Sequence, residues 1–247
     1  MKLLLISNST MAGGPYLGWP RQHISRFLGR YGVQKVCFVP YAGVNLDPES
    51  LAASYDAYTQ RVAEVFGALG ISVRGVHRDT DPVKAVQSAD AVVVGGGNTF
   101  HLVAEMHKTG LMHAIREKVL TGTPFVGWSA GANVACPTLM TTNDMPIVEP
   151  PSFNTLGLVP FQINPHYLDA NPAGHGGETR QQRIEEFLAV NRDKTVAGLR
   201  EGCLLRLEEG ELHLEGDKSL RIFSHGKPPL EIDPGSDLSF LLQPQSR

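Results

Sequence analysis

The sequence predicts an α/β fold built on one mostly parallel sheet, and two observations carry that prediction. Short apolar and β-branched runs, typical of strands buried on both faces, recur along the first half of the chain. Between them lie stretches whose apolar residues are three and four positions apart, as in amphipathic helices. Because strands and helices alternate, we expect parallel strands, helices on both faces, and a ligand site beyond the carboxyl ends of the strands.

The elements follow one another in a regular order. Strands are predicted over 3–6, 36–39, 71–76, 91–94 and 125–128. Residues 51–69 form the clearest helix, because their apolar side chains make one stripe. Asp81 and Pro82 have the pattern of a helix cap and first turn, and further helices are predicted over 99–106 and 111–120.

From residue 196 onward the pattern changes to short alternating runs broken by glycine. Glu209 and Gly210 lie between two such runs, which predicts a β-hairpin and therefore antiparallel strands. No linker, repeat or low-complexity tract separates this part from the rest. We expect residues 1–247 to form a single α/β domain.

The composition favours a small ligand as the partner. The chain has 22 Lys and Arg against 25 Asp and Glu, and its net charge of -3 is not gathered into a basic patch for nucleic acid. The opening MKLLLIS is too short for a signal peptide or a membrane span. Cys37, Cys136 and Cys203 match no zinc or redox spacing, and an odd count argues against a disulfide framework. A cytoplasmic protein without nucleic-acid or membrane partners is expected.

The stretch Gly127-Trp128-Ser129-Ala130-Gly131 fits the G-x-S-x-G nucleophile elbow. It follows a predicted buried strand and precedes a helix start of small residues, as that motif requires. The strained turn brings the two flanking glycine positions close together, and the helix that follows aims its amides at the reaction centre. Ser129 is therefore predicted to be a nucleophile, the alternative being an incidental serine in a tight turn.

A glycine-rich loop offers the oxyanion hole that such a nucleophile needs. Gly95, Gly96 and Gly97 directly follow a buried strand, which frees backbone amides to face a ligand. We predict that the amides of Gly97 and Ala130 stabilise the oxyanion. Phosphate binding is disfavoured, because the loop has no Walker lysine and lacks the spacing of the dinucleotide fingerprint.

The general base is sought among nine histidines. His166 follows an apolar run over 158–163, predicted to be a strand, and would emerge at the strand end beside the pocket. His175 lies in the loop NPAGHGGETR, where an exposed or substrate-facing position is expected. His166 is therefore the predicted base for Ser129.

Several of these stretches together resemble the peptidase E family of aspartyl dipeptidases. The resemblance rests on GGGNTF, GWSAGAN, TTNDMPI, INPH, GETR and the Glu201-Gly202 pair, which occur in the family's order and spacing. LLLISNST and PYAGV are also similar. The resemblance implies a cytoplasmic serine exopeptidase that cleaves dipeptides with an N-terminal aspartate and needs no metal or cofactor. It also implies a three-layer sandwich like the flavodoxin-like, class I glutamine amidotransferase group.

Carried over residue by residue, the resemblance makes Ser129 the nucleophile and His166 the base, but it leaves the orienting acid open. Asp144 in TTNDMPI and Glu201 in LREG each match an acid proposed for the family. Glu201 follows a predicted strand over 196–199, whereas Asp144 lies in a polar loop. A carboxylate that orients histidine must be fixed and partly dry, and this separates the two only in part.

An aspartyl dipeptide also calls for a cation that reads a planar carboxylate, and arginine does this bidentately. Arg180 in GETRQQR matches the family's motif arginine; without the resemblance it would be a solvated residue at the start of a helix over 178–190. Asn98 and His175 are expected as further substrate contacts. A homodimer is one expectation for the quaternary state.

The expected reaction is acyl transfer to Ser129 with His166 as base and then acid, followed by hydrolysis of the acyl-enzyme. One alternative is a related amidase acting on β-linked, cyanophycin-like aspartyl peptides. Another is a non-catalytic module of the same fold that binds a small anion. Cysteine catalysis is disfavoured, because the elbow residue is Ser129 and Cys136 lies further along the predicted helix.

Overall fold

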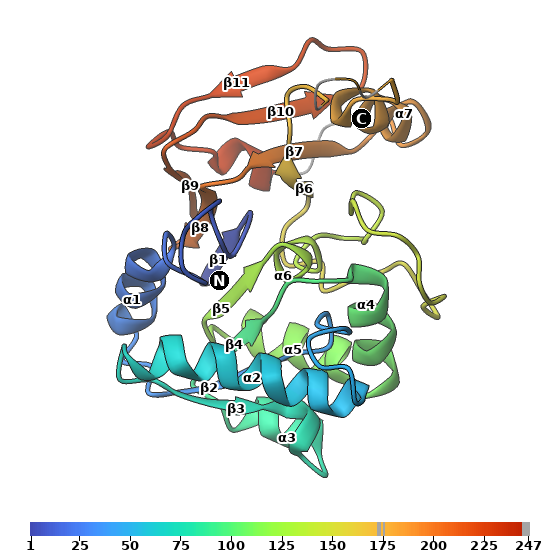
Figure 1. Cartoon of the computed structure of the whole chain (residues 1–247). Helices are drawn as coiled ribbons and strands as arrows, with labels where there is room; N and C mark the ends of the chain where they lie inside the picture. Colours follow the sequence, from blue (N-terminus) through green and yellow to red (C-terminus); the bar gives the residue numbers. More distant parts are fainter. Residues whose placement is uncertain (172–173, 175, 244–247) are drawn as a thin grey trace.

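The fold is organised around a seven-stranded sheet in the order β3-β2-β4-β5-β1-β8-β9 (Figure 1). The arrangement is that of a computed structural model, which describes residues 1–171, 174 and 176–243. Two antiparallel strands, β8 (Cys203–Glu208) and β9 (Glu211–Gly216), extend the sheet beyond β1. The parallel strands are β1 (Leu3–Ile6), β2 (Lys35–Val39), β3 (Ser72–Gly75), β4 (Ala91–Val94) and β5 (Phe125–Trp128).

Successive residues of the central strands point to opposite faces of this sheet, and helices cover both faces. Leu4 and Ile6 of β1 pack in one buried cluster with side chains of α1 (Arg21–Arg30) and α2 (Leu51–Gly67). Leu3 and Leu5 pack in a second cluster on the other face. That second cluster includes α3 (Pro82–Gln87), α4 (Thr99–Lys108) and α5 (Leu111–Leu120). The predicted three-layer α/β arrangement is thereby confirmed.

A smaller sheet lies beside the large one, in the order β11-β10-β7-β6 (Figure 1). One face of the smaller sheet is covered by α7 (Arg180–Val190). The other face contributes Ile163 and Leu199 to the buried cluster that contains Leu3 and Leu5 of β1. Residues of both sheets therefore share one buried cluster, and the single domain stays a prediction. The strands are β6 (Gln162–Tyr167), β7 (Thr195–Arg200), β10 (Leu220–Ser224) and β11 (Leu230–Ile232), of which β6 and β7 are parallel.

Local signals in the sequence have the expected outcomes at several points. Asp81 caps α3 by accepting a hydrogen bond from the Lys84 amide, with Pro82 at the first helical turn. Glu209 and Gly210 form the β8–β9 turn, and both have positive φ, 53° and 88°. Short helical turns complete the chain: η1 (Val76–Arg78), α6 (Ala130–Asn133) and η2 (Ser239–Leu242).

The strand predicted over 158–163 is wrong in position, because the strand in this part of the chain, β6, begins only at Gln162 and continues to Tyr167. The amides of Leu158 and Val159 bond to the carbonyl of Ala135 rather than to a neighbouring strand. Pro165 is accepted within β6 because this strand lies at the edge of the small sheet, where a missing N–H is tolerated. His166 consequently lies inside a strand, not after one.

None of the helices among the described residues is both long enough and apolar enough to cross a membrane.

Candidate active site

Ser129 occupies a strained turn between β5 and α6. Its φ of 54° and ψ of -114° are unusual for a residue with a side chain, and its amide donates to the carbonyl of Ile6 at 3.0 Å. A Cβ atom on Gly127 would lie 2.2 Å from the carbonyl oxygen of Gly131. The two glycines of the motif are therefore required by close packing, which holds the serine hydroxyl at the strand end.

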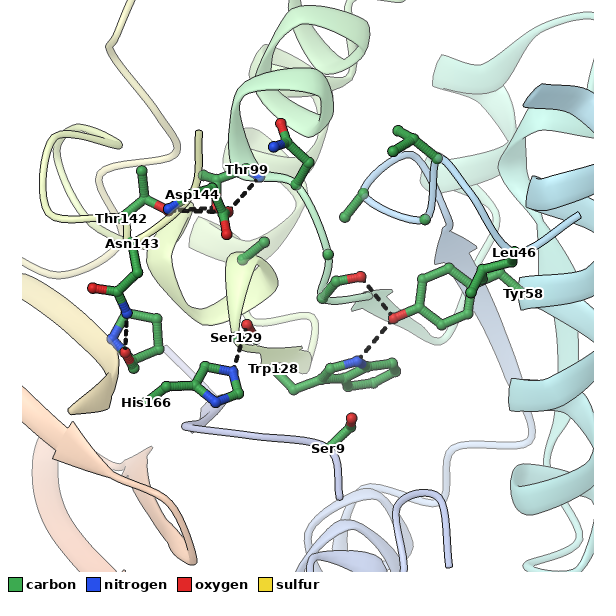
Figure 2. A pocket seen from close by; sticks show the side chains of 18 of the residues that line it. Ser9, Leu46, Tyr58, Thr99, Trp128, Ser129, Thr142, Asn143, Asp144 and His166 are labelled. Atoms are coloured by element: carbon green, nitrogen blue, oxygen red, sulfur yellow. Dashed lines mark hydrogen bonds between the residues drawn. The ribbon is translucent and has the colours of Figure 1, made fainter. Parts of the chain in front are cut away.

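His166 lies against this serine. Its Nε2 atom is 2.9 Å from Ser129 Oγ, and its Nδ1 atom is 2.7 Å from Glu201 Oε1. Figure 2 shows the imidazole reaching toward Ser129 from β6. When Nδ1 carries the proton and donates a hydrogen bond to Glu201, Nε2 is free to accept the serine proton. The fold thus brings together a hydroxyl, an imidazole and a carboxylate in line.

A bulge in β6 aims the histidine. The register of β6 against β7 shifts between Pro165 and Tyr167, and His166 has a φ of 53°. The His166 amide donates to Ser7 Oγ at 3.0 Å, and the Ser7 hydroxyl donates to the Leu199 carbonyl at 2.7 Å. Ser7 is fully buried, so it locks the backbone of His166 to the end of β1.

Glu201 lies in the turn between β7 and β8. Asn8, the second residue after the end of β1, holds that turn in place. The Gly202 amide donates to Asn8 Oδ1 at 2.9 Å. Gly202 has a φ of 85°, which a residue with a side chain rarely adopts. Ser7 and Asn8 therefore support the histidine and the acid from one short segment.

Asp144, the other predicted acid, has different partners. Its Oδ2 atom accepts hydrogen bonds from the Thr99 amide at 2.7 Å and the Thr99 hydroxyl at 2.6 Å. These bonds place the carboxylate at the N-terminus of α4, where a negative charge is stabilised. The hydrogen-bond partner of His166 is Glu201. Figure 2 shows Asp144 near Thr99 and Thr142, away from the imidazole.

The predicted oxyanion donors border the same space. The amides of Gly97 and Ala130 make no hydrogen bond within the described part of the chain. Gly97 has a φ of 131°, and a Cβ atom there would lie 2.1 Å from the carbonyl oxygen of Ala42. Both residues line the cavity that contains Ser129. Two free N–H groups beside a nucleophile are the chemistry that an oxyanion hole needs.

Asn98 has a structural task at this site. Its Oδ1 atom accepts from the His101 amide and so caps α4, while Nδ2 donates to the carbonyl of Met145. Asn98 also lines the cavity. The second hydrogen on Nδ2 is the one available to a substrate.

Arg180, the first residue of α7, is a partly buried cation that lines the cavity. Among the described residues it makes no hydrogen bond or ion pair, although Asp144 attracts it. Burial lowers the pKa of its guanidinium, the positive charge of Arg183 adds to that effect, and Asp144 opposes it. An anion bound beside Arg180 would relieve this desolvated charge. His175, the other predicted substrate contact, lies outside the described residues.

These groups surround a cavity of about 640 Å³, large enough for a small peptide. It is polar at the serine and carries aromatic side chains on one wall, where Trp128 Nε1 donates to Tyr58 at 3.1 Å. No cluster of metal-binding side chains is found within the part of the chain that the structure describes. Sequence reasoning missed Ser7, Asn8 and Thr99; polar residues directly after a buried strand were the available signal for the first two.

A serine hydrogen-bonded to a histidine on an α/β fold is an arrangement found in hydrolases of the serine type. The model of peptidase family S51 matches residues 3–215, and the chain belongs to this family. It is therefore a peptidase.

Relatives of nearly the same length carry one name. The chain is 48% identical to a Peptidase E from a Nostoc species over 98% of this chain and 97% of the relative. It is 50% identical to a Peptidase E from Streptomyces coelicolor, covering 98% and 95%. A Salmonella typhimurium Peptidase E is 43% identical, covering 95% and 99%.

Solved structures share the fold at low identity. A peptidase from an acI-B1 Actinobacterium has a TM-score of 0.70 at 18% identity, covering 97% of this chain and 96% of that chain. A putative peptidase E from Listeria monocytogenes has a TM-score of 0.60 at 20% identity, covering 88% and 98%. These likenesses concern the fold and agree with the α/β architecture described above.

Proposed function

We propose that this peptidase is a serine dipeptidase for Asp-Xaa substrates, with Ser129 as nucleophile, His166 as base and Glu201 as the acid that orients His166. The observation that carries the proposal is the row of short contacts from Ser129 Oγ to His166 Nε2, 2.9 Å, and from His166 Nδ1 to Glu201 Oε1, 2.7 Å. A carboxylate in this position selects the tautomer that can accept the serine proton.

In the proposed reaction, Ser129 Oγ attacks the aspartyl carbonyl while His166 takes the proton of the serine hydroxyl. The amides of Gly97 and Ala130 stabilise the resulting oxyanion, and one such donor is worth about 3 kcal/mol. His166 then protonates the leaving amine, and water hydrolyses the acyl-enzyme.

The aspartyl residue of such a substrate carries an ammonium and a β-carboxylate, and the cavity offers one partner of opposite charge for each. Asp144 suits the ammonium, because its carboxylate borders the cavity and is held in place by Thr99. Arg180 suits the β-carboxylate, because its guanidinium has a planar fork and no internal ion pair among the described residues. Asn98 is a further donor.

A panel of dipeptides tests this proposal together with a nucleophile variant. We expect Asp-Leu to be cleaved faster than Asn-Leu, Glu-Leu or β-linked Asp-Leu, and Ser129→Ala to lower kcat by at least about a thousandfold. Ser9→Ala is the matched control, because Ser9 lines the same cavity without contacting His166. Preferred cleavage of the β-linked substrate would favour the cyanophycin-like amidase instead. Near-normal turnover by folded Ser129→Ala would exclude the serine mechanism.

The homodimer and the cytoplasmic location stay predictions. Exposed apolar side chains follow Asp144 in the chain, with Met145 77% and Ile147 55% exposed. Sedimentation of the wild type against a Met145→Asp, Ile147→Asp variant would test whether this segment supports self-association.

A further inference from the structure

A second arginine lines the cavity that contains Ser129 and Arg180. Arg61 projects from α2, its side chain is exposed, and within the described residues it makes no hydrogen bond or ion pair. Its guanidinium carbon lies 5.3 Å from the centre of the Tyr16 ring. Stacking on an aromatic face holds a guanidinium while leaving its N–H groups free at the edge.

The surface on which Arg61 rests is connected to the nucleophile. The Tyr16 ring meets Trp128 edge-on at 6.5 Å between ring centres, and Trp128 directly precedes Ser129. The indole of Trp128 donates to Tyr58 at 3.1 Å, and the Tyr58 hydroxyl donates to the Gly96 carbonyl at 2.9 Å. Arg61 is one helical turn from Tyr58, so it stands on a wall that leads to the serine.

The two arginines belong to different sides of the cavity. In Figure 2, Asp144 and Thr99 lie above Ser129, whereas Tyr58 and Leu46 lie to the right of it, so the two pairs border different sides of the cavity. Arg180 lines a second, smaller cavity together with Thr142 and Asp144, which assigns it to the first side. Arg61 accompanies Tyr58 on the second side. A substrate whose scissile carbonyl lies at Ser129 would therefore meet one cation on its acyl side and another on its leaving side.

We infer that Arg61 binds the C-terminal carboxylate of the leaving residue and so limits this enzyme to dipeptides. The inference rests on the proposed function, since an Asp-Xaa substrate has one carboxylate on each side of its single peptide bond. A tripeptide presents an uncharged amide where the dipeptide has its carboxylate, and moves the charge by about 3.5 Å. Arg61 thereby distinguishes substrates by length, while Arg180 distinguishes them by the first side chain.

The experiment compares three substrates on wild type, Arg61→Met and Arg61→Lys: Asp-Leu, its C-terminal amide, and aspartyl p-nitroanilide. We expect the wild type to prefer Asp-Leu over the amide by about tenfold or more, chiefly through KM. Arg61→Met keeps an apolar stem against Tyr16. We expect it to lower kcat/KM for Asp-Leu about tenfold and to leave kcat/KM for the other two substrates unchanged. Arg61→Lys retains part of the preference. Arg26→Met on α1, an exposed arginine bonded to Gln22, is the matched control.

The outcomes separate this inference from the function on which it rests. If the wild type cleaves Asp-Leu and its amide equally well, or if Arg61→Met affects all three substrates alike, Arg61 does not bind the terminal carboxylate. The proposed cleavage of aspartyl substrates is not contradicted by either result. If the wild type cleaves none of the three, the proposed function fails before any variant is compared, and the inference falls with it.

Discussion

Asp144 and Glu201 show how two carboxylates near one site differ by what their oxygens accept. Glu201 faces the ring nitrogen of His166, whereas Asp144 is held by the amide and hydroxyl of Thr99. A carboxylate bonded to imidazole acts on proton transfer, and one that borders the cavity acts on binding. The two therefore belong to different steps of the proposed reaction.

Replacing each by its amide separates these roles. Glu201→Gln should lower kcat on Asp-Leu by about two to four powers of ten, the upper figure being the loss known for a triad acid, with little change in KM. Asp144→Asn should chiefly raise KM, because the substrate ammonium loses its partner. Steady-state kinetics on both variants, with thermal unfolding as a check, measures this. A large loss of kcat in Asp144→Asn alone would return Asp144 to the triad.

Arg180 sets the preference for aspartate in the proposed function. Arg180→Met should lower kcat/KM for Asp-Leu by about ten- to a hundredfold, as expected for one charged hydrogen-bond partner, and should leave Asn-Leu nearly unchanged. Arg183→Met, one helical turn further along α7 and 57% exposed, is the matched control. Equal losses on both substrates would mean that Arg180 does not read the β-carboxylate.

Among the elements, β1 has an influence that extends beyond its four buried residues. The two residues that follow it, Ser7 and Asn8, bond to the backbone of β6, of β7 and of the turn that carries Glu201. One strand end thus aligns the two elements that supply His166 and Glu201. The bulge at His166 depends on the same contacts.

Ser7→Ala tests this alignment. The change leaves the partly buried N–H of His166 and the buried carbonyl of Leu199 without their side-chain partner, at a cost of about 1–3 kcal/mol in the free energy of unfolding. Because the freed amide is that of His166, we also expect kcat to fall about tenfold at constant KM, a loss of about 1.4 kcal/mol in transition-state stabilisation. Urea unfolding and steady-state kinetics give the two numbers. A variant with reduced stability but wild-type kcat would make Ser7 purely structural.

At the scale of the whole molecule, Glu215 on β9 joins α1 to the sheet edge. It contacts His23 at 2.7 Å and also pairs with Arg206 of β8. The hydrogen bond to His23, reinforced by Arg206, lowers the pKa of Glu215 from 4.5 to about 2, against the opposing effect of burial. A carboxyl whose pKa is lower in the folded state stabilises the fold at pH values above its pKa in the unfolded state. That contribution is lost as the pH falls from about 4.5 towards 2.

We therefore expect Glu215→Gln to be less stable than the wild type at pH 6, by up to about 3 kcal/mol, and the difference to shrink by pH 3. Urea unfolding at both pH values measures it. Glu211→Gln, on the same strand but 72% exposed, is the control and should change little. A difference independent of pH would indicate lost packing rather than lost charge pairing.

Prediction from the sequence succeeded where the signal is local. The strands over 3–6, 91–94 and 125–128 and the helix over 111–120 have the predicted bounds, because buried strands and amphipathic helices leave their period in the residues themselves. No bounds are predicted for helix α1, since its buried residues Ile24, Phe27 and Leu28 stand among charged and polar ones. Strand β6 was misplaced, because Pro165 signals an interruption that an edge position removes.

The sequence by itself therefore determined the α/β class, the elbow at Ser129 and the glycine loop beside it, since close backbone contacts leave room only for glycine. Which carboxylate lies against His166 was decided by the tertiary structure alone. Glu201 is 35 residues from His166, and Ser7 is 159 residues from it. Such partners meet because two sheets share one core, and that pairing depends on topology rather than on any pattern within a segment.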